Sequence, residues 1–254
     1  SFKFGKKDGV WKPFYDNGMI SEEENYENGI QIGSQKDYDI DGKLMLDRLF
    51  TKTEIKKYAC YDKSGVVVKE GQAKGGDLDY TGYFPDGKTI SSHLTIKDKL
   101  IEGKATIYYP NGVLKTEYNY VNSVKMGPAK FYFLNGNIER EVNYKDDVAD
   151  GYFVGYTIHG DVLNEGWYVD GNLQGRWLYN NAIGVVSKDE YYLNDEQIGV
   201  QHYYDNFGVK DNDVFYDENG QFAKMQEFDS TGNMINYFEL KNGSGDFKSV
   251  NLDK

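Results

Sequence analysis

Aromatic and aliphatic residues recur along this chain at fixed distances from a series of glycines. The glycines are Gly18, Gly42, Gly65, Gly87, Gly112, Gly136, Gly160, Gly184, Gly208 and Gly232. Their successive spacings are 24, 23, 22 and 25 residues, followed by five spacings of 24 residues. An internal period of this length predicts a repeat architecture in which each repeat is one supersecondary unit.

Within each period the apolar positions follow the alternation of extended strands. The residue four before the glycine is aromatic in nine of ten repeats, from Phe14 to Phe228. Aliphatic residues such as Ile138 dominate two positions after the glycine, and aromatic residues such as Tyr144 and Tyr168 dominate eight positions after it. These offsets share even parity, so extended strands point them to one face. We expect that face to be the core.

A second glycine lies nine residues before the first in most repeats, as in Gly127 and Gly151. Each period then holds two turns and two runs of strand length, which predicts one hairpin per repeat. Dipeptides such as Asn135-Gly136 favour the positive φ of hairpin turns. Because a lone hairpin cannot bury its apolar face, consecutive hairpins should pair edge to edge. Independent sandwiches would require longer, more aliphatic strands and Greek-key crossovers.

The predicted fold class is all-β: an elongated, solenoid-like single sheet of about ten 24-residue antiparallel β-hairpins, twisted and curved. We expect residues 1–254 to form one continuous array. Repeats are degenerate over 50–103 and regular over 104–240, and 241–254 form a C-terminal cap or tail. The degenerate stretch is either functional or the result of neutral drift. The chain starts in mid-repeat, so we expect it to be a portion of a longer protein.

Several segments resemble the bacterial variant of the MORN repeat, whose pattern is G-x-W-x-x-Y-Y-x-N-G followed by a tyrosine and G-x-x-x-G. The segments 9–18, 103–112 and 127–136 match the first half, and 26–33 and 168–175 match the second half. The resemblance implies a stacked β-hairpin ribbon. Family members include antitoxin-like immunity proteins, surface proteins of host-associated bacteria and eukaryotic membrane-junction scaffolds.

The composition disfavours two classes of partner. The net charge is −12, from 41 acidic and 29 basic residues, so neither nucleic acid nor a direct contact with an anionic membrane is expected. Apolar runs fall well short of the roughly 18 residues of a transmembrane segment. The single cysteine, Cys60, cannot form an internal disulfide.

An acidic row lies five residues after the turn glycine, at odd parity and therefore opposite the main aromatic rows. Eight of ten repeats carry Asp or Glu there. One interpretation is a solvated face with cross-strand Lys and Arg partners; the other is a docking stripe for a basic partner. The candidate partner-binding residues are Glu117, Glu141, Glu165, Asp189, Asp213 and Trp167.

Other candidate chemistry is weak. The segment Asp37–Leu44 imitates the first half of a calcium loop, but Arg48 stands where a bidentate Glu is required. His93, His159 and His202 fall at different offsets, several hairpins apart, which argues against a zinc site or a proton relay. The sequence therefore predicts no catalytic, cofactor-binding or metal-binding residues, no cofactor and no enzyme activity.

The resulting functional hypothesis is a non-catalytic protein–protein interaction or scaffold module. Its concrete forms are an antitoxin-like immunity protein or a structural subunit of a bacterial cell-envelope or secretion complex. The alternative is a surface glycan-binding protein that uses exposed aromatic rings, although the rings fall mostly at core parity. The bacterial periplasm, outer membrane or cell surface is favoured over the cytoplasm.

Overall fold

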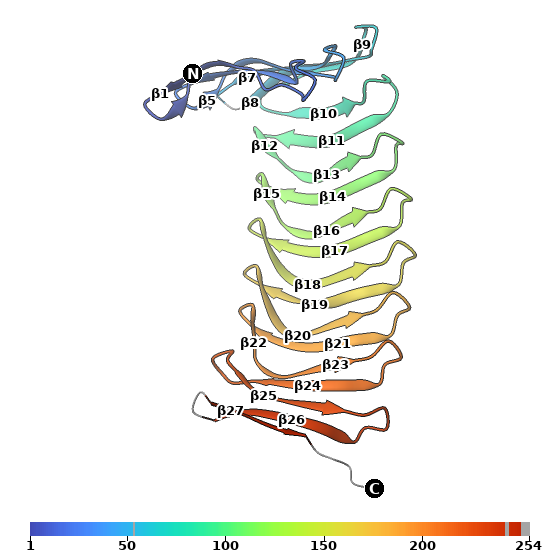
Figure 1. Cartoon of the computed structure of the whole chain (residues 1–254). Helices are drawn as coiled ribbons and strands as arrows, with labels where there is room; N and C mark the ends of the chain where they lie inside the picture. Colours follow the sequence, from blue (N-terminus) through green and yellow to red (C-terminus); the bar gives the residue numbers. More distant parts are fainter. Residues whose placement is uncertain (53, 242–243, 250–254) are drawn as a thin grey trace. The chain divides into compact units, whose positions relative to one another are not determined.

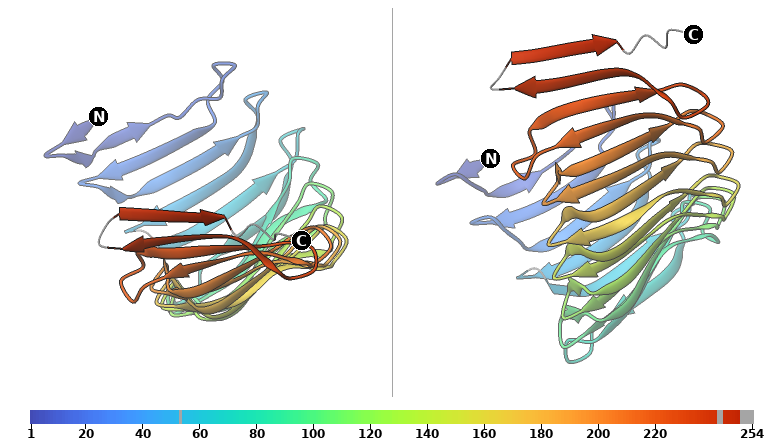
Figure 2. Two further views of the ribbon diagram at one scale, coloured as in Figure 1. Left: turned by 60° about the horizontal axis from the view of Figure 1, so that its bottom comes forward. Right: turned by 90° about the horizontal axis from the view of Figure 1, so that it is seen from below.

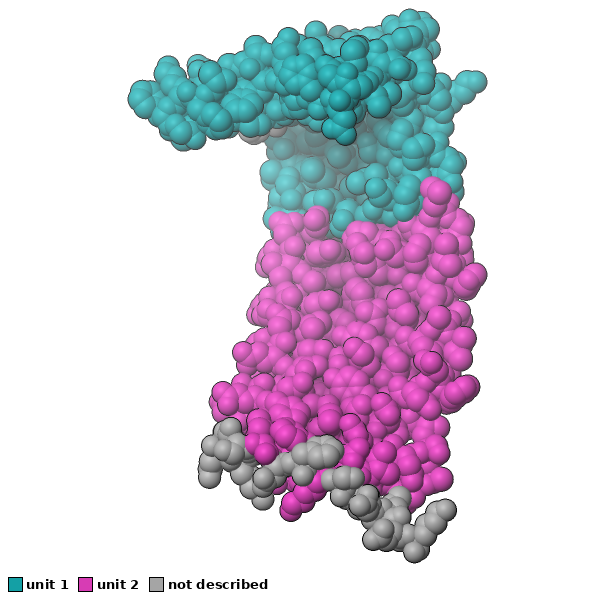
Figure 3. Space-filling model, viewed as in Figure 1, with its two compact units in different colours: residues 1–124 teal, residues 125–254 magenta. Residues whose placement is uncertain are grey.

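The computed structural model describes residues 1–52, 54–241 and 244–249. Strands and turns make up this part of the chain, and it contains no helix. The predicted all-β class built from antiparallel hairpins is confirmed. The chain divides into two compact units, unit 1 (Ser1–Val124) and unit 2 (Lys125–Lys254), which Figure 3 colours separately.

Unit 1 contains two larger sheets and one small one. Its strands are β1 (Phe2–Lys3), β2 (Lys6–Lys7), β3 (Gly9–Trp11), β4 (Glu22–Glu27), β5 (Ile30–Gln31), β6 (Gly33–Tyr38), β7 (Leu44–Thr51), β8 (Glu54–Tyr61), β9 (Val67–Gln72), β10 (Leu78–Tyr83), β11 (Ile90–Lys97), β12 (Leu100–Ile101), β13 (Gly103–Tyr108) and β14 (Leu114–Val121). Strands β1 and β2 pair with each other, and a seven-stranded sheet runs in the order β3-β4-β6-β7-β8-β9 with β5 beside β4. Strands β10, β11, β13 and β14 then pair in order, with β12 beside β11.

Unit 2 is an uninterrupted ladder of antiparallel strands (Figures 1 and 2). Its strands are β16 (Gly127–Tyr132), β17 (Ile138–Lys145), β18 (Val148–Tyr156), β19 (Val162–Val169), β20 (Asn172–Asn180), β21 (Val186–Leu193), β22 (Glu196–Gln197), β23 (Gly199–Tyr204), β24 (Lys210–Tyr216), β25 (Phe222–Phe228), β26 (Met234–Lys241) and β27 (Ser244–Ser249). Strand β15 (Val124–Lys125) lies at the boundary between the units. Each strand pairs with the next along the chain, so side-chain rows run across successive hairpins.

Two turns per period are present, as predicted, but the second turn does not lie at the second glycine. The Asn135-Gly136 turn is a five-residue loop closed by hydrogen bonds from Phe133 N to Asn137 O (2.8 Å) and from Gly136 N to Phe133 O (2.9 Å). The tighter turn is Asp146-Asp147, where both residues have positive φ and Lys145 pairs directly with Val148. This is the geometry of a two-residue type I′ hairpin, whose twist matches that of the strands.

The predicted rows lie on the core face, but the most buried side chains are at other positions. Of the buried apolar side chains described in unit 2, Ala129, Trp177 and Val142 lie seven before or six after the turn glycine, whereas Val154 lies on the opposite face. Ala129 is the register partner of Val142, so odd offsets of the first strand share a face with even offsets of the second. Side chains alternate between the two faces within a strand, but this alternation does not continue from one strand to the next through a turn. A bulge between Phe131 and Tyr132 also shifts the register, which leaves Tyr132 half-buried.

The degenerate stretch contains a break in the ladder of unit 1. Strand β9 ends one sheet and β10 begins the next, so these consecutive strands do not pair. Side chains of β8 instead bond the free edge of β10: the Tyr58 hydroxyl accepts from Thr81 N (3.1 Å) and donates to Asp79 O (3.3 Å). Tyr58 and Cys60 are 1% exposed and pack with Leu78 and Tyr80 into one core cluster. Burial of the Cys60 thiol raises its pKa.

Candidate functional site: the carboxylate face of unit 2

One face of unit 2 carries the predicted acidic row, and we call it the carboxylate face. Its members are placed by strand register across the hairpins. Glu165 pairs with Leu178, Leu178 with Asp189, Asp189 with His202, and His202 with Asp213. Because register partners point to the same side of a sheet, these residues form one continuous row. Glu141 extends the row by one hairpin, through its pairing with Val154 and that of Val154 with Glu165.

Each carboxylate of the row has a partner in its own hairpin. Lys130 Nζ lies 3.0 Å from Glu141, and Lys104 Nζ lies 2.9 Å from Glu117 in unit 1. The Tyr152 hydroxyl donates to the carboxylate of Glu165. The structure thus surrounds these carboxylates with the cross-strand partners that a solvated face provides, and exposed pairs of this kind contribute roughly 0–1 kcal/mol each.

The last two carboxylates of the predicted row are buried. Asp189 and Asp213 are each only 7% exposed. Arg176 donates to both carboxylate oxygens of Asp189 at 2.8 Å, and this ion pair raises the pKa of Arg176. His202 Nδ1 lies 2.6 Å from Asp213, with Lys210 Nζ 3.2 Å from the same carboxylate. Asp189 and Asp213 therefore hold neighbouring cations in place rather than presenting free charge.

Three aromatic rings stand exposed beside the row, and with Arg176 they form what we call the aromatic surface. The exposed fractions are 54% for Trp167, 38% for Tyr152 and 39% for Tyr191. The rings of Tyr152 and Trp167 have centroids 5.7 Å apart and planes inclined at 56°. Tyr152 is the register partner of Trp167, and Arg176 is the register partner of Tyr191.

A hollow of about 270 Å³ lies next to the ring of Trp167. It is lined by Tyr152, Glu165, Gly166, Trp167, Arg176 and Leu178. Its walls combine an aromatic ring, a carboxylate and a guanidinium, so it offers stacking and hydrogen bonding to one ligand. Within the described residues, the indole N–H of Trp167 donates no hydrogen bond, and one oxygen of Glu165 has no partner.

The opposite face of the same hairpins fixes the backbone under this hollow. Trp177 is 1% exposed and donates from Nε1 to Trp167 O at 3.1 Å. Its ring packs against Phe153 and Tyr168, with centroids 5.5 and 5.1 Å away. Gly166 leaves room for this ring, since a Cβ there would lie 2.2 Å from it. The backbone that carries Trp167 is thus anchored by the core.

The electrostatics of the hollow favour a neutral tyrosine. Burial and the hydrogen bond to Glu165 raise the pKa of Tyr152 to about 12. A carboxylate that accepts from the phenol stabilises the protonated form. At neutral pH the site therefore presents a neutral phenol beside the Glu165 side chain and the Arg176–Asp189 pair.

Of the six predicted residues, Trp167 belongs to the aromatic surface, and Glu165 and Asp189 bond its members Tyr152 and Arg176. Glu141 and Asp213 lie farther along the same face, and Glu117 belongs to unit 1. The contributions of Tyr152, Arg176 and Tyr191 were missed by the sequence analysis. They lie eight before or seven after the turn glycine, positions at which other repeats carry Ser34, Lys104 or Asn143. Tyr152 and Tyr191 stand out as tyrosines at positions where no other repeat carries one, whereas no feature of the sequence singles out Arg176.

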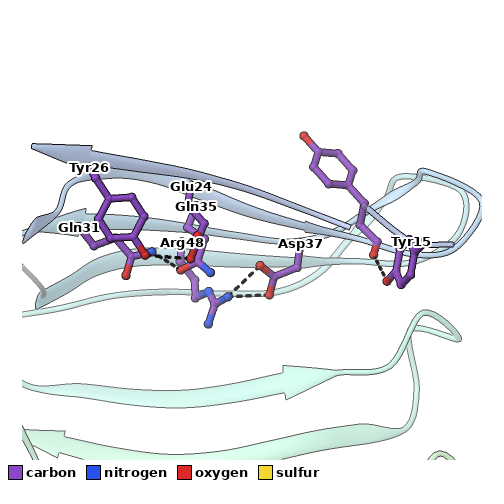
Figure 4. A network of polar contacts seen from close by, with 8 residues as sticks. Tyr15, Glu24, Tyr26, Gln31, Gln35, Asp37 and Arg48 are labelled. Carbon is purple, nitrogen blue, oxygen red and sulfur yellow. Dashed lines mark hydrogen bonds and ion pairs between the residues drawn. The ribbon is translucent and has the colours of Figure 1, made fainter. Parts of the chain in front are cut away.

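A second polar cluster lies in unit 1 (Figure 4). Arg48 donates to both carboxylate oxygens of Asp37, at 2.9 and 2.6 Å, while burial raises the pKa of Asp37. Gln31 bonds Gln35 close by. Arg48, which breaks the calcium-loop pattern, is therefore the partner of that pattern's first carboxylate. Its third residue, Asp39, accepts from the backbone N–H groups of Asp41 and Lys43 within the turn.

Across the described part of the chain, no group of three or more His, Cys, Asp and Glu side chains is placed to hold a metal ion. Nor does that part include a helix long and apolar enough to cross a membrane.

Comparison with known proteins identifies a repeat type in three segments. Residues 7–28, 101–122 and 127–146 match the model of the MORN repeat variant. These three segments are therefore similar to that repeat variant. The predicted resemblance is confirmed at this level. No curated protein matches the chain.

The solved structures that match this chain are much larger proteins. A crystal structure of TcdB2-TccC3 is 12% identical, and the match covers 95% of this chain and 15% of that one, with a TM-score of 0.23. A Tc holotoxin pore of Photorhabdus luminescens is 11% identical over 95% of this chain and 14% of that one, with a TM-score of 0.22. The chain spans about 15% of the first of these structures. A likeness at this level establishes neither fold nor function for this chain.

Proposed function

We propose that this chain is a non-catalytic interaction module and that it docks its partner on the aromatic surface of unit 2. The carrying observation is the exposure of Trp167, Tyr152 and Tyr191 beside Arg176 on one sheet face. Trp, Tyr and Arg are the residue types that dominate binding energy at interfaces. The carboxylate partners of Tyr152 and Arg176 hold these two side chains in fixed positions, which lowers the entropy lost on binding.

The first candidate partner is another protein. In this form the module is an antitoxin-like immunity protein or a structural subunit of a bacterial cell-envelope or secretion complex. Its location is then the periplasm, the outer membrane or the cell surface. The MORN repeats in residues 7–28, 101–122 and 127–146 support an interaction role of this kind.

The second candidate partner is a surface glycan, and one observation favours it. Trp167 and Tyr191 occupy the same position in successive repeats, seven residues after the turn glycine. Their rings project from the carboxylate face, away from the core rows, so the exposed rings do not have the core parity expected from the sequence.

A differential capture experiment tests the proposed surface. The whole chain is immobilised in three forms: unchanged, with Trp167→Ala and Tyr191→Ala together, and with Phe207→Ala as the matched control. Phe207 is 86% exposed on a turn away from the aromatic surface. We expect ligand recovered from the native envelope extract to bind the unchanged chain and the control equally, and to be lost from the double variant. Equal recovery on all three forms would remove the aromatic surface from consideration.

A further inference from the structure

The exposed rings of the carboxylate face recur with the period of the sheet. Trp167, Tyr191 and Phe215 each lie two residues after a carboxylate of the row, on strands β19, β21 and β24. Residues two apart on a strand point to the same side. Because the register joins Glu165, Asp189 and Asp213 in one row, the three rings form a second row beside it.

Two ladder steps separate neighbouring rings of this row. Strand β20 lies between β19 and β21, and β23 lies between β21 and β24. With strands about 4.8 Å apart, successive rings are spaced by about 10 Å. That spacing is close to the length of two sugar residues in an extended, β-linked polysaccharide, where every second ring presents the same flat face.

We propose that the aromatic surface binds an uncharged, extended, β-linked polysaccharide, with alternate sugar rings stacked on Trp167 and Tyr191. This inference rests on the proposed function, since it names the ligand of the same surface. A linear polymer with a two-residue repeat matches a linear array of rings, whereas a folded protein surface has no such repeat. The hollow beside Trp167, of about 270 Å³, accommodates one sugar ring against the indole.

Polar groups for sugar hydroxyls flank the stacking ring. Glu165 keeps one carboxylate oxygen unbonded within the described structure, because the Tyr152 hydroxyl engages the other one. Arg176 uses Nε and Nη2 on Asp189, and its side chain is 53% exposed. An acceptor and a donor thus line the same hollow as the indole, an arrangement that suits hydroxyl groups at the edge of a stacked sugar.

The negative charge of the chain disfavours acidic polysaccharides as ligands. The net charge is −12, and the row beside the rings is made of carboxylates, so an anionic polymer is repelled. Two cations of this face are already paired with carboxylates, Arg176 with Asp189 and Lys130 with Glu141. An uncharged polymer therefore fits the surface better than an acidic one.

The third ring of the row is covered. Lys224 Nζ lies 3.9 Å from the centroid of the Phe215 ring, a cation–π contact. Trp167 and Tyr191 are the two exposed rings of the row. Because alternate sugars stack on them, the shortest ligand that reaches both contains three sugar residues. A disaccharide reaches only one ring.

The test is isothermal titration of the whole chain with defined oligosaccharides. Cellohexaose and N-acetylated chitohexaose are both uncharged and β-linked. They represent polysaccharides without and with N-acetyl groups on the sugar rings. Maltohexaose has the same length but is α-linked and coiled. We expect binding of one or both β-linked hexaoses, with cellobiose at least about tenfold weaker because it reaches only one ring. Maltohexaose should give no measurable heat.

Variants locate the binding. Trp167→Ala and Tyr191→Ala should each weaken binding of the hexaose about tenfold, while Trp167→Phe retains a ring and most of the affinity. Phe207→Ala is the exposed aromatic control and should leave binding unchanged. Far-UV circular dichroism of each variant checks that the chain is folded.

Three outcomes would overturn the inference: no binding of either β-linked hexaose, equal binding of maltohexaose, or affinity that is indifferent to both ring deletions. If the oligosaccharides fail while the double variant still loses its partner in the capture experiment, the surface is an interaction site for protein. If both experiments fail, the proposed function fails as well.

Discussion

The pair Trp167 and Trp177 gives the sharpest prediction about how unit 2 is built. The two residues are ten positions apart, on opposite faces of neighbouring strands, and are joined by one hydrogen bond from the indole of Trp177 to Trp167 O. Trp177 is 1% exposed and Trp167 is 54% exposed. Replacing each by Ala removes the same atoms from two different environments.

The expected costs follow from burial. A fully buried Trp removes roughly 150–250 Å² from water, which at about 25 cal/mol/Å² corresponds to about 4–6 kcal/mol. Measured Trp→Ala costs in cores are about 3–5 kcal/mol, and we expect Trp177→Ala to lie in that range. Trp167→Ala loses its contact with Tyr152 and part of its buried area, so its cost should be about 1 kcal/mol.

Urea unfolding followed by far-UV circular dichroism measures both free energies of unfolding. Trp177→Phe is the matched control, because it retains a ring against Phe153 and Tyr168 and should recover part of the loss. Equal destabilisation by Trp167→Ala and Trp177→Ala would refute the assignment of the two faces. It would also remove the basis for treating Trp167 as a ligand contact.

Three further predictions test the local chemistry. Gly166→Ala should destabilise unit 2 by at least about 2 kcal/mol, because its Cβ would lie 2.2 Å from the Trp177 ring; urea unfolding measures it, and a neutral substitution contradicts the packing. The pKa of Tyr152 is about 12 through burial and Glu165, so Glu165→Gln should lower it, as seen by NMR titration of ring-labelled tyrosine; an unchanged midpoint speaks against the hydrogen bond. Hydrogen bonds from Thr231 and Asn233, within the same turn, lower the pKa of Asp229 to about 2. The Asp229 carboxylate therefore stabilises the fold above the ordinary pKa of an aspartate, near 4, and this contribution is lost as pH falls toward about 2. Asp229→Asn should therefore flatten the loss of stability over that pH range, and an identical acid profile would be evidence against the turn.

The hairpin architecture was predictable because it depends on spacing. The recurring glycines, about 24 residues apart, and the alternation of apolar residues predict two strands per period and the loop at the first glycine, and both were found. The turn at Asp146-Asp147 was not predictable from glycines, because two Asp residues adopt the positive φ there. Short polar side chains tolerate this conformation, and the sequence gives no glycine to mark it.

The face of each side chain was harder to predict than the strands. The core face depends on the register across each hairpin, in which Ala129 meets Val142, and register is set by loop closure and bulges that parity counting ignores. The same limitation concealed the site. Trp167 was identified from its residue type, but its neighbours Tyr152 and Tyr191 become part of one surface only when strands β18 to β21 are aligned.

The break in the sheet between β9 and β10 is a third feature that could not be predicted from the sequence. Irregular spacing marked the stretch 50–103 as degenerate without showing that the ladder stops there. What replaces the missing pairing is a side-chain contact, the Tyr58 hydroxyl on the backbone of Asp79 and Thr81. A contact of this kind depends on the packing of two sheets, and hydrophobic periodicity does not report it.

The most direct measurement of the central claim is an NMR titration of the indole N–H groups. The chain has three tryptophans, so a ¹⁵N-labelled sample gives three indole signals, from Trp11, Trp167 and Trp177. On addition of cellohexaose or chitohexaose, the signal of Trp167 should shift progressively while those of Trp11 and Trp177 stay in place. A shift confined to Trp11 or Trp177, or three unmoved signals at saturating ligand, would contradict a polysaccharide-binding surface at Trp167.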